Sequence, residues 1–244
     1  MARFVEDLTL TLPLLCGSDW YDASVVPVPL GDPATVNLSD LRVAVHTDNG
    51  LAPAAADVAG VVNEAAAALR SVGVTVNEDR PQALTQTLDL FLGHVMADGG
   101  AGLQRVVDMT NTREISSHMK TLRGLQVERQ LTTAEFFGLA YNTDQYRNKM
   151  LAFMRQYDMI LCPANAQVAV PHDATLDPDL WPAFTYTMSY NLTGWPGVVV
   201  RCGTSSEGLP VGVQIVARPW CEHVALAAAL FLEKEMGGWQ RPLI

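Results

Sequence analysis

Apolar and polar positions along the chain follow two patterns, one typical of helices and one typical of buried strands. Apolar residues recur at helical spacing over residues 5–15, and Ala and Leu fill residues 53–71 after Pro53. Short Val- and Ile-rich runs stand at residues 41–46, 74–78 and 157–163. Helical spacing predicts helices with a buried face, and short apolar runs predict buried strands. The pattern predicts an α/β protein whose strand–helix–strand unit over residues 41–78 pairs parallel strands.

The second half of the chain combines helices with a late β-hairpin. Residues 81–157 are mostly helical in pattern, with breaks expected near Gly99-Gly100 and near Leu131-Thr132, where TTAE resembles a capped helix start. The runs GVVVRCG and VGVQIVA read as neighbouring strands around a turn, and residues 225–236 form a helix that is apolar nearly all round. We therefore expect part of a mixed β-sheet flanked by helices, with residues 1–244 forming a single domain.

Composition narrows the range of partners. The 244 residues carry a formal net charge of −10, and an acidic protein repels phosphate backbones, so we expect no nucleic-acid partner. There is no basic amphipathic run and no long apolar run, so we expect no membrane partner. The first residues lack a signal-peptide core, and the four cysteines lie far apart, mostly in apolar runs. These features predict a cytoplasmic protein with buried, reduced thiols.

Two adjacent serines, Ser205 and Ser206, raise the question of a nucleophile. They stand in GTSSEGLP between two strand patterns, and Gly203 and Gly208 supply the backbone freedom that tight turns need. A nucleophile also needs a base within hydrogen-bond reach, and the neighbouring sequence supplies none. The sequence predicts a hairpin turn here.

Two further pairs resemble catalytic arrangements. Ser117 and Lys120 share one helical face, but charged neighbours indicate a solvated surface, where lysine remains a cation and cannot act as a base. Cys162 precedes His172 by ten positions, yet a cysteine at the end of an apolar strand is usually inert. The histidines show no metal-ligand spacing, and no glycine-rich phosphate loop is present. We expect no metal and no cofactor.

Several ordered segments resemble the amidase signature family. MARFVEDLTL resembles the family segment that contains G-P-M-A-R, YDMILCP resembles its Y-D-x-(I/L)-(L/V)-x-P, and NLTGWPGVVVRCG with GLPVGVQIV resembles its late strand pair. The family uses a Ser-cisSer-Lys triad whose serines lie in a Gly/Ser-rich stretch upstream of these segments. No such stretch occurs here, so the resemblance assigns no catalytic residue. It implies the C-terminal half of an amidohydrolase, with the N-terminal catalytic half as a missing partner.

The resemblance also implies which residues contact a small-molecule amide substrate. Residues of the loop after Cys162 and of the segment around Asn191 usually face the pocket in this family. The expected pocket or wall residues are Pro163, Asn165, Thr187, Tyr190, Asn191 and Trp195.

The expected substrate follows from one departure from the family pattern. Met188 and Phe184 add apolar surface, and Trp195 and Trp181 point the same way. Phe184 also replaces an aspartate with which amidotransferase subunits handle an acidic substrate. These features favour a largely uncharged acyl or aryl amide, with carbamates and esters left open.

Two other hypotheses stay open at this point. The chain could be a non-catalytic binding or regulatory module that keeps the amidase fold, or a hydrolase that uses Ser117–Lys120 or Cys162–His172. A homodimer is compatible with each of them.

Overall fold

A five-stranded mixed sheet forms the centre of the computed structural model, which describes residues 1–127, 130–172 and 174–241. The strand order is β2-β1-β3-β5-β4. The strands are β1 (Arg42–Val45), β2 (Thr75–Glu78), β3 (Met159–Pro163), β4 (Gly197–Thr204) and β5 (Pro210–Ala217). β1 runs parallel to β2 and β3, whereas β5 runs antiparallel to β3 and β4. The mixed sheet, the parallel pair and the late hairpin are thus confirmed.

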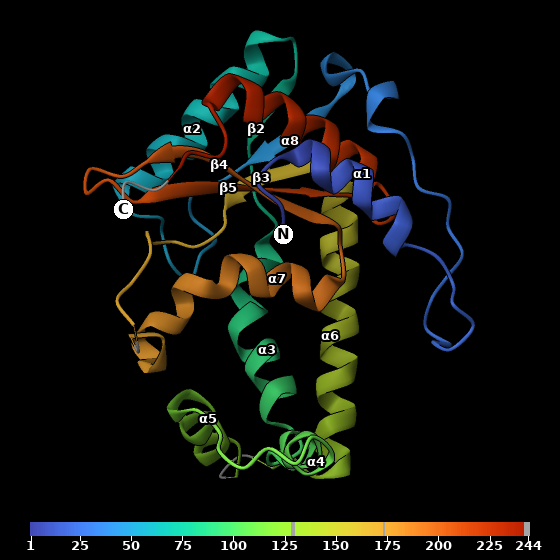
Figure 1. Ribbon diagram of the computed structural model, residues 1–244, viewed down its shortest axis with the longest axis vertical. Coiled ribbons are helices and arrows are strands. Elements are labelled where there is room, and N and C mark those ends of the chain that lie inside the picture. The colour runs from blue at the N-terminus through green and yellow to red at the C-terminus, as the bar shows by residue number, and fades with distance from the viewer. Residues whose placement is uncertain (128–129, 173, 242–244) are drawn as a thin grey trace.

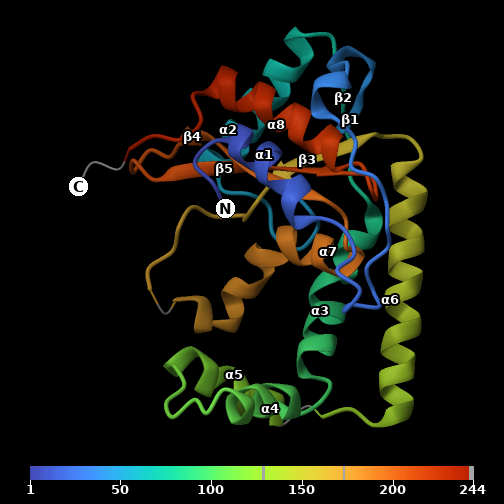
Figure 2. The ribbon, with the colours of Figure 1, turned by 45° about the vertical axis from the view of Figure 1, so that its right-hand side comes forward.

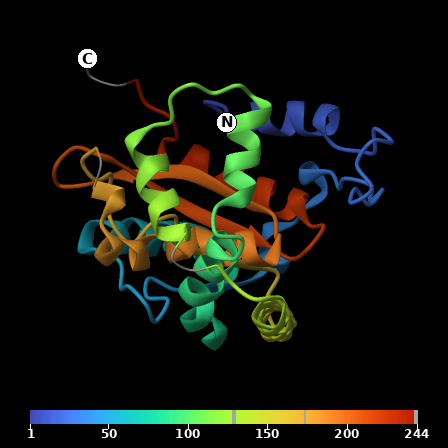
Figure 3. The same ribbon diagram turned by 90° about the horizontal axis from the view of Figure 1, so that it is seen from below.

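Helices cover both faces of the sheet (Figure 1). The upper face in that view carries α1 (Val5–Leu15), α2 (Ala56–Ser71) and α8 (Glu222–Met236), and the lower face carries α3 (Thr87–Met96), α6 (Thr133–Met154) and α7 (Thr185–Thr193). The helices α4 (Ala101–Met109) and α5 (Ser117–Val127) lie at the far end of α3 and α6 (Figure 2). Seen from below, α6 is viewed almost end-on, so it projects away from the sheet (Figure 3). The lower helices thus form an arm that carries α4 and α5.

Alternating residues of the strands separate two apolar cores. Val43 and Val45 face the upper core, whereas Ala44 between them faces the lower one. The same alternation assigns Leu161 to the upper core and Cys162 to the lower core. This is the period-two pattern of a sheet that is covered on both sides.

Two boundaries and one whole helix differ from the sequence expectation. The helix expected from Pro53 begins at Ala56, because Pro53 forms a bridge with Asp48 and the amide of Ala55 donates to the carbonyl of Ala166 at 2.7 Å. A further break separates α4 from α5, where Asn111 has a positive φ of 49°. The pattern also assigned no element to the residues of α7. Polar side chains of α7 hydrogen-bond inside the protein, so they do not follow the apolar spacing of a surface helix.

The predicted breaks within residues 81–157 are confirmed. Gly99 and Gly100 have φ values of 64° and 84°, a conformation that favours glycine. Thr132 and Glu135 form a capping box at the start of α6, in which each side chain accepts a hydrogen bond from the other residue's backbone N–H.

The four cysteines are free, as expected, but only two of them are buried. Cys162 and Cys202 lie in the core, Cys221 is half-buried and Cys16 is exposed. Cys16 follows the last turn of α1, whose end reaches solvent, so the expectation of a buried thiol was wrong at this position. Burial raises the pKa of Cys202 to about 12, which makes that thiol inert.

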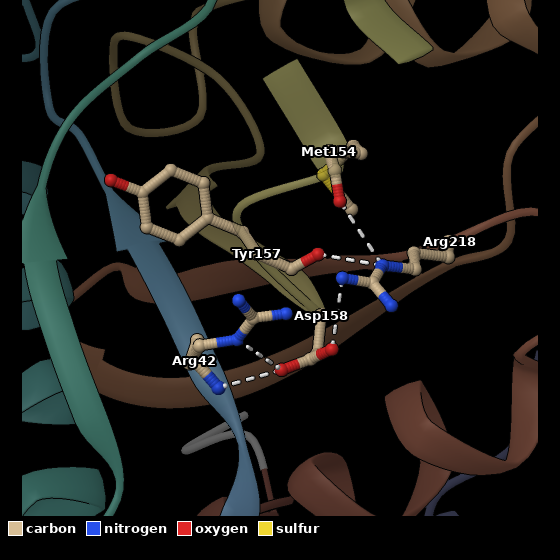
Figure 4. Close-up of polar contacts among 5 residues, drawn as sticks. All are labelled: Arg42, Met154, Tyr157, Asp158 and Arg218. Carbon is tan, nitrogen blue, oxygen red and sulfur yellow. Dashed lines mark hydrogen bonds and ion pairs between the residues drawn. The ribbon is translucent and has the colours of Figure 1, made fainter. Parts of the chain in front are cut away.

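One cluster of charges ties the amino ends of the central strands together (Figure 4). Asp158 accepts hydrogen bonds from the backbone N–H of Arg42 at 2.9 Å and from its Nε at 3.3 Å, and it pairs with Arg218 at 3.1 Å. Arg218 also donates to the carbonyls of Met154 and Tyr157. The segment Tyr157-Asp158 thereby joins β1, the end of α6 and the residue after β5.

Within the described ranges, no helix combines the length and the apolar character needed to cross a membrane.

Candidate functional site

An apolar groove of about 400 Å³ lies within the lower helices, between α5 on one side and α3 and α7 on the other. α3, α5, α7 and the 3₁₀ segments at residues 174–176 and 178–184 each contribute to it. The lining residues are Phe91, Leu92, Val95, His118, Met119, Thr121, Leu122, Leu125, Thr175, Trp181, Phe184 and Met188. None of these described lining residues is an aspartate, glutamate, lysine or arginine, so the groove suits an uncharged group.

The wall of the groove is fixed by the aromatic Trp181. Its Nε1 donates to the carbonyl of Thr175 at 3.2 Å, and the imidazole of His118 on α5 hydrogen-bonds the hydroxyl of Thr175. Trp181 is half-buried, and the carbonyl that pairs its N–H belongs to Thr175, whose hydroxyl is also the contact of His118 on α5. Phe184 and Met188 complete this side, so three of the four apolar residues singled out in the sequence line one groove, and Trp195 lies in the lower core instead.

α7, which carries several expected site residues, is held by a buried polar network. The Thr87 hydroxyl lies 3.0 Å from the hydroxyl of Tyr146 and 2.9 Å from that of Ser189. The Ser189 hydroxyl donates to the carbonyl of Thr185, and the side-chain Nδ2 of Asn49 donates to the Thr185 hydroxyl at 2.7 Å. A buried network in which each hydroxyl has a partner is rigidifying. It fixes α7 relative to α3, α6 and the loop after β1.

The structure separates the six expected site residues into three places. Pro163 is buried at the end of β3, and Asn165, two residues later, accepts a hydrogen bond from the amide of Gln167. Tyr190 and Trp195 are enclosed in the lower core, where their rings stack with centroids 6.5 Å apart.

The last two expected residues lie on α7. Thr187 is half-buried beside Met188 and donates to the carbonyl of Phe184 at 3.1 Å, whereas Asn191 is exposed. Among the six, Tyr190 and Trp195 are the pair whose rings contact each other.

Ser205 and Ser206 occupy the β4–β5 turn, as the sequence predicted. The amide of Ser205 donates to the carbonyl of Leu209, and Gly208 has a φ of 82°. Ser206 donates from both its backbone N–H and its hydroxyl to one oxygen of Asp57, at 2.8 and 2.7 Å. These bonds hold the pKa of Asp57 below its usual value. The partner of Ser206 is thus a carboxylate that anchors the turn to α2.

The other two pairs do not form catalytic arrangements. Cys162 is fully buried, with Gln214 Nε2 at 3.3 Å and the Tyr190 hydroxyl at 3.9 Å, whereas His172 is exposed. Burial raises the pKa of Cys162 to about 11, so the thiol stays protonated at neutral pH. Ser117 and Lys120 are both exposed on α5, in agreement with the surface interpretation.

Sequence reasoning missed the contribution of α3 and α5 to the groove. Phe91 on α3 and Leu122 and Leu125 on α5 all line the groove, and the two helices contact each other. Their helical spacing was the available signal, but that spacing indicates only that a face is covered, not which residues cover it.

The comparisons with known proteins agree with this architecture. The family model described as Amidase matches residues 1–226. This chain belongs to the amidase family. It is 24% identical to a glutamyl-tRNA(Gln) amidotransferase subunit of Methylorubrum populi, covering 97% of this chain and 54% of that protein. It is 30% identical to fatty-acid amide hydrolase 2-B of Danio rerio, covering 99% of this chain and 48% of that protein.

Solved structures of the family share the fold. The chain superposes on 6-aminohexanoate cyclic dimer hydrolase with a TM-score of 0.80 at 25% identity, covering 99% of this chain and 55% of the other. It superposes on a fatty acid amide hydrolase with a TM-score of 0.80 at 21% identity, covering 97% and 47%. The chain therefore spans about half the length of the relatives that it matches.

Contacts within this fold explain three residues of the amidase-like motifs. Gln214 donates to the carbonyl of Tyr186 at 3.0 Å and thereby joins β5 to α7. Gly194 ends α7 with a φ of 71°, and a Cβ at Gly203 would overlap the side chain of Val61 on α2. These motif residues hold the sheet and its helices together.

Proposed function

We propose that this chain forms the C-terminal part of an amidohydrolase that cleaves linear amide bonds. Membership of the amidase family supports amide hydrolysis, and two of the relatives and neighbours are named as amide hydrolases. The nucleophile, the lysine base and the oxyanion donors are proposed to come from residues outside this sequence. Without them the chain lacks the groups that lower the barrier, on the order of 10⁶ in rate for serine hydrolases.

The apolar groove carries the proposal for the substrate class. A groove lined by Trp181, Phe184 and Met188 without a lysine or arginine favours an uncharged acyl or aryl group. Phe184 has no charge with which to bind the ammonium group of an acidic amino-acid substrate. We therefore place amides of apolar acyl or aryl groups first, and screen carbamates and esters beside them.

The catalytic half is proposed to cover an apolar surface around α1. Leu10, Leu14 and Leu15 are 73%, 81% and 81% exposed, and Trp20 and Tyr21 follow them on the surface. A neighbouring groove of about 650 Å³ lies between α1, α8 and the start of β4. Exposed apolar side chains of this kind are typical of an interface, and the relatives' length, about twice that of this chain, supplies the candidate occupant.

The setting proposed for the reaction follows from the chemistry of the chain. Four free cysteines and a net charge of −10 support a cytoplasmic enzyme without a nucleic-acid or membrane partner. We further propose that residues 1–244 act as one domain, and the native mass of the assembled enzyme tests for a homodimer.

The first experiment measures the denatured mass of the protein, isolated from its source, after treatment with a fluorophosphonate probe. The proposal expects label either on a polypeptide of about twice 26.5 kDa or on a second chain that co-purifies with this one. An unlabelled 26.5 kDa protein without a labelled partner would favour the binding or regulatory module instead.

The second experiment tests the groove in the assembled, labelled enzyme. Leu122→Asp places a charge in the groove and is expected to lower kcat/KM for apolar amides by roughly 10- to 100-fold. Val106→Asp on α4 is the matched control, because Val106 is exposed outside the groove. Equal effects of the two variants on kcat/KM would mean that the groove does not bind the substrate.

A further inference from the structure

A second, polar hollow lies at the carboxyl ends of β1 and β2. It has a volume of about 480 Å³ and shares no lining residue with the apolar groove. Because the two strands are parallel, the residues that follow them meet at one edge of the sheet. The lining residues are Val45, His46, Thr47, Asp48, Asn63, Glu78, Asp79 and Arg80.

His46 and Arg80 enter this hollow with buried atoms that have no partner. The His46 side chain is only 8% exposed and stacks on the ring of Tyr186 with centroids 5.8 Å apart. No group in the described part of the chain completes a well-aligned hydrogen bond to either ring nitrogen, although the backbone of Asp48 lies near the ring, and Nη1 of Arg80 also has no partner there. Buried polar atoms nearly always have a partner, so three unpaired atoms beside one hollow indicate that something else supplies it.

Burial explains the chemical form of His46. Burial, followed by the charge of Arg80, lowers the pKa of His46 to about 4. The imidazole is therefore neutral at pH 7 and offers one N–H donor and one acceptor nitrogen. Arg80 adds a cationic donor beside it.

Some carboxylate oxygens around the hollow accept hydrogen bonds from the protein, and others do not. Both oxygens of Asp79 accept hydrogen bonds, from the Tyr157 hydroxyl at 2.8 Å and from the backbone N–H of Arg80 at 2.8 Å. One oxygen of Asp48 accepts from the amide of Gly50 at 2.7 Å. Among the described residues, the second oxygen of Asp48 and the carboxylate of Glu78 accept no hydrogen bond, so they remain for a cationic donor.

We propose that this hollow binds a small zwitterion of the α-amino acid type. Arg80 and His46 would take its carboxylate, and Asp48 and Glu78 would take its ammonium group. A simple anion is disfavoured by three carboxylates around one guanidinium, and a bare cation is disfavoured by the guanidinium itself. An ammonium and a carboxylate one carbon apart satisfy both sides. The proposal does not depend on the chain being half of an amidohydrolase.

Calorimetric titration with glycine, the smallest probe, tests the site. We compare glycine and L-alanine with acetate and methylammonium at pH 7, each up to about 100 mM, since sites for such small ligands bind in the millimolar range. The expected result is saturable binding of glycine that is at least about tenfold tighter than that of acetate or methylammonium.

Two variants assign the binding to the hollow. Arg80→Gln and Glu78→Gln remove one charge from each side, and each is expected to weaken glycine binding by about tenfold. Arg113→Gln, on the exposed segment between α4 and α5, is the matched control and should bind like the parent protein. Glu78 is exposed, so its substitution tests the acidic side of the site without changing the packing around Arg80.

Three results would overturn the proposal. The first is no glycine binding by the folded protein, which means that solvent alone fills the hollow. The second is acetate binding as tight as that of glycine, which means an anion site. The third is glycine binding that is unchanged in both variants, which places the ligand elsewhere.

Discussion

At each end of β1 an arginine lies beside carboxylates, but the two ends differ in whether that arginine has partners within the protein. At the amino end, Asp158 lies between Arg42 and Arg218, and its carboxylate accepts hydrogen bonds from Arg42 and forms an ion pair with Arg218 (Figure 4). At the carboxyl end, Arg80 follows Asp79, and its buried Nη1 has no partner in the described chain. One end therefore completes its hydrogen bonds within the fold, and the other does not.

The difference separates a structural cluster from a candidate binding site. The Asp158 cluster joins three segments of the chain through donors and acceptors that are all supplied internally. The His46–Arg80 end is held by stacking on Tyr186 and by close packing of Arg80 over Gly50, and these contacts leave its polar atoms unused. We expect changes at the first end to lower stability and changes at the second end to affect ligand binding and pH dependence.

The largest expected effect is that of Asp158→Ala. The variant removes the acceptor for Arg42 and Arg218 and is expected to lower the free energy of unfolding by about 2–3 kcal/mol. Denaturant titration measures this loss. Asp144→Ala is the control, because the exposed pair of Asp144 with Arg147 spans one helical turn and should contribute less than about 0.5 kcal/mol. Equal losses of unfolding free energy in the two variants would mean that the Asp158 cluster does not stabilise the fold.

The next effect concerns the acid stability that His46 controls. Its folded-state pKa of about 4 lies below the ordinary value of 6.5, so the unfolded state binds the proton first as the pH falls. The contribution is present above pH 6.5 and is lost between about pH 6.5 and 4, and it amounts to about 2 kcal/mol between pH 7 and 5. His46→Gln lacks this loss, so its unfolding free energy should fall less over that interval. If the plots of unfolding free energy against pH were parallel for the parent and the variant, His46 would not be buried in its neutral form.

A smaller effect is expected for Arg218→Gln. The variant loses the pair with Asp158 and the bonds from Nε to the carbonyls of Met154 and Tyr157. Because Asp158 keeps its bonds to Arg42, the loss should be about 1–2 kcal/mol. Thermal and chemical unfolding measure it, and a variant as stable as the parent would show that the three bonds are replaced by water.

The smallest effect is expected for Arg80→Gln. The buried Nη1 of its guanidinium has no hydrogen-bond partner in the described chain, so the free energy of unfolding should change by less than about 0.5 kcal/mol without ligand. The comparison with Arg218→Gln uses the same substitution at the other end of the sheet. If Arg80→Gln lowered the free energy of unfolding as much as Arg218→Gln, both arginines would stabilise the fold, and the proposed difference between the two ends would be wrong.

The strands and breaks that local sequence marks strongly were predictable. Continuous apolar runs gave β1, β3 and the β4–β5 hairpin, and paired glycines gave the break after α3, because burial and positive φ are local requirements. α7 was not predictable from spacing, since Thr185 and Ser189 are buried polar residues with distant partners. The start of α2 was misplaced because the bridge of Pro53 to Asp48 is a contact across a loop.

The candidate site was predictable only in part. Trp181, Phe184 and Met188 were singled out as apolar, and the structure brings them into one groove, while Tyr190 and Trp195 lie in the lower core. His46 has no sequence signal beyond its place at a strand end, so its burial emerged only from the packed structure.

The sequence by itself determined the class of fold, the turn nature of Ser205 and Ser206, and the resemblance to the amidase family. These follow from periodicity, turn residues and ordered motifs, all of which act over a few positions. Only the tertiary structure decided that Asp158 meets Arg42 across 116 positions, and that α3 and α5 close a groove against Trp181. Short-range pattern encodes which residues must be buried, but the partners of a buried or charged group are set by how distant segments pack.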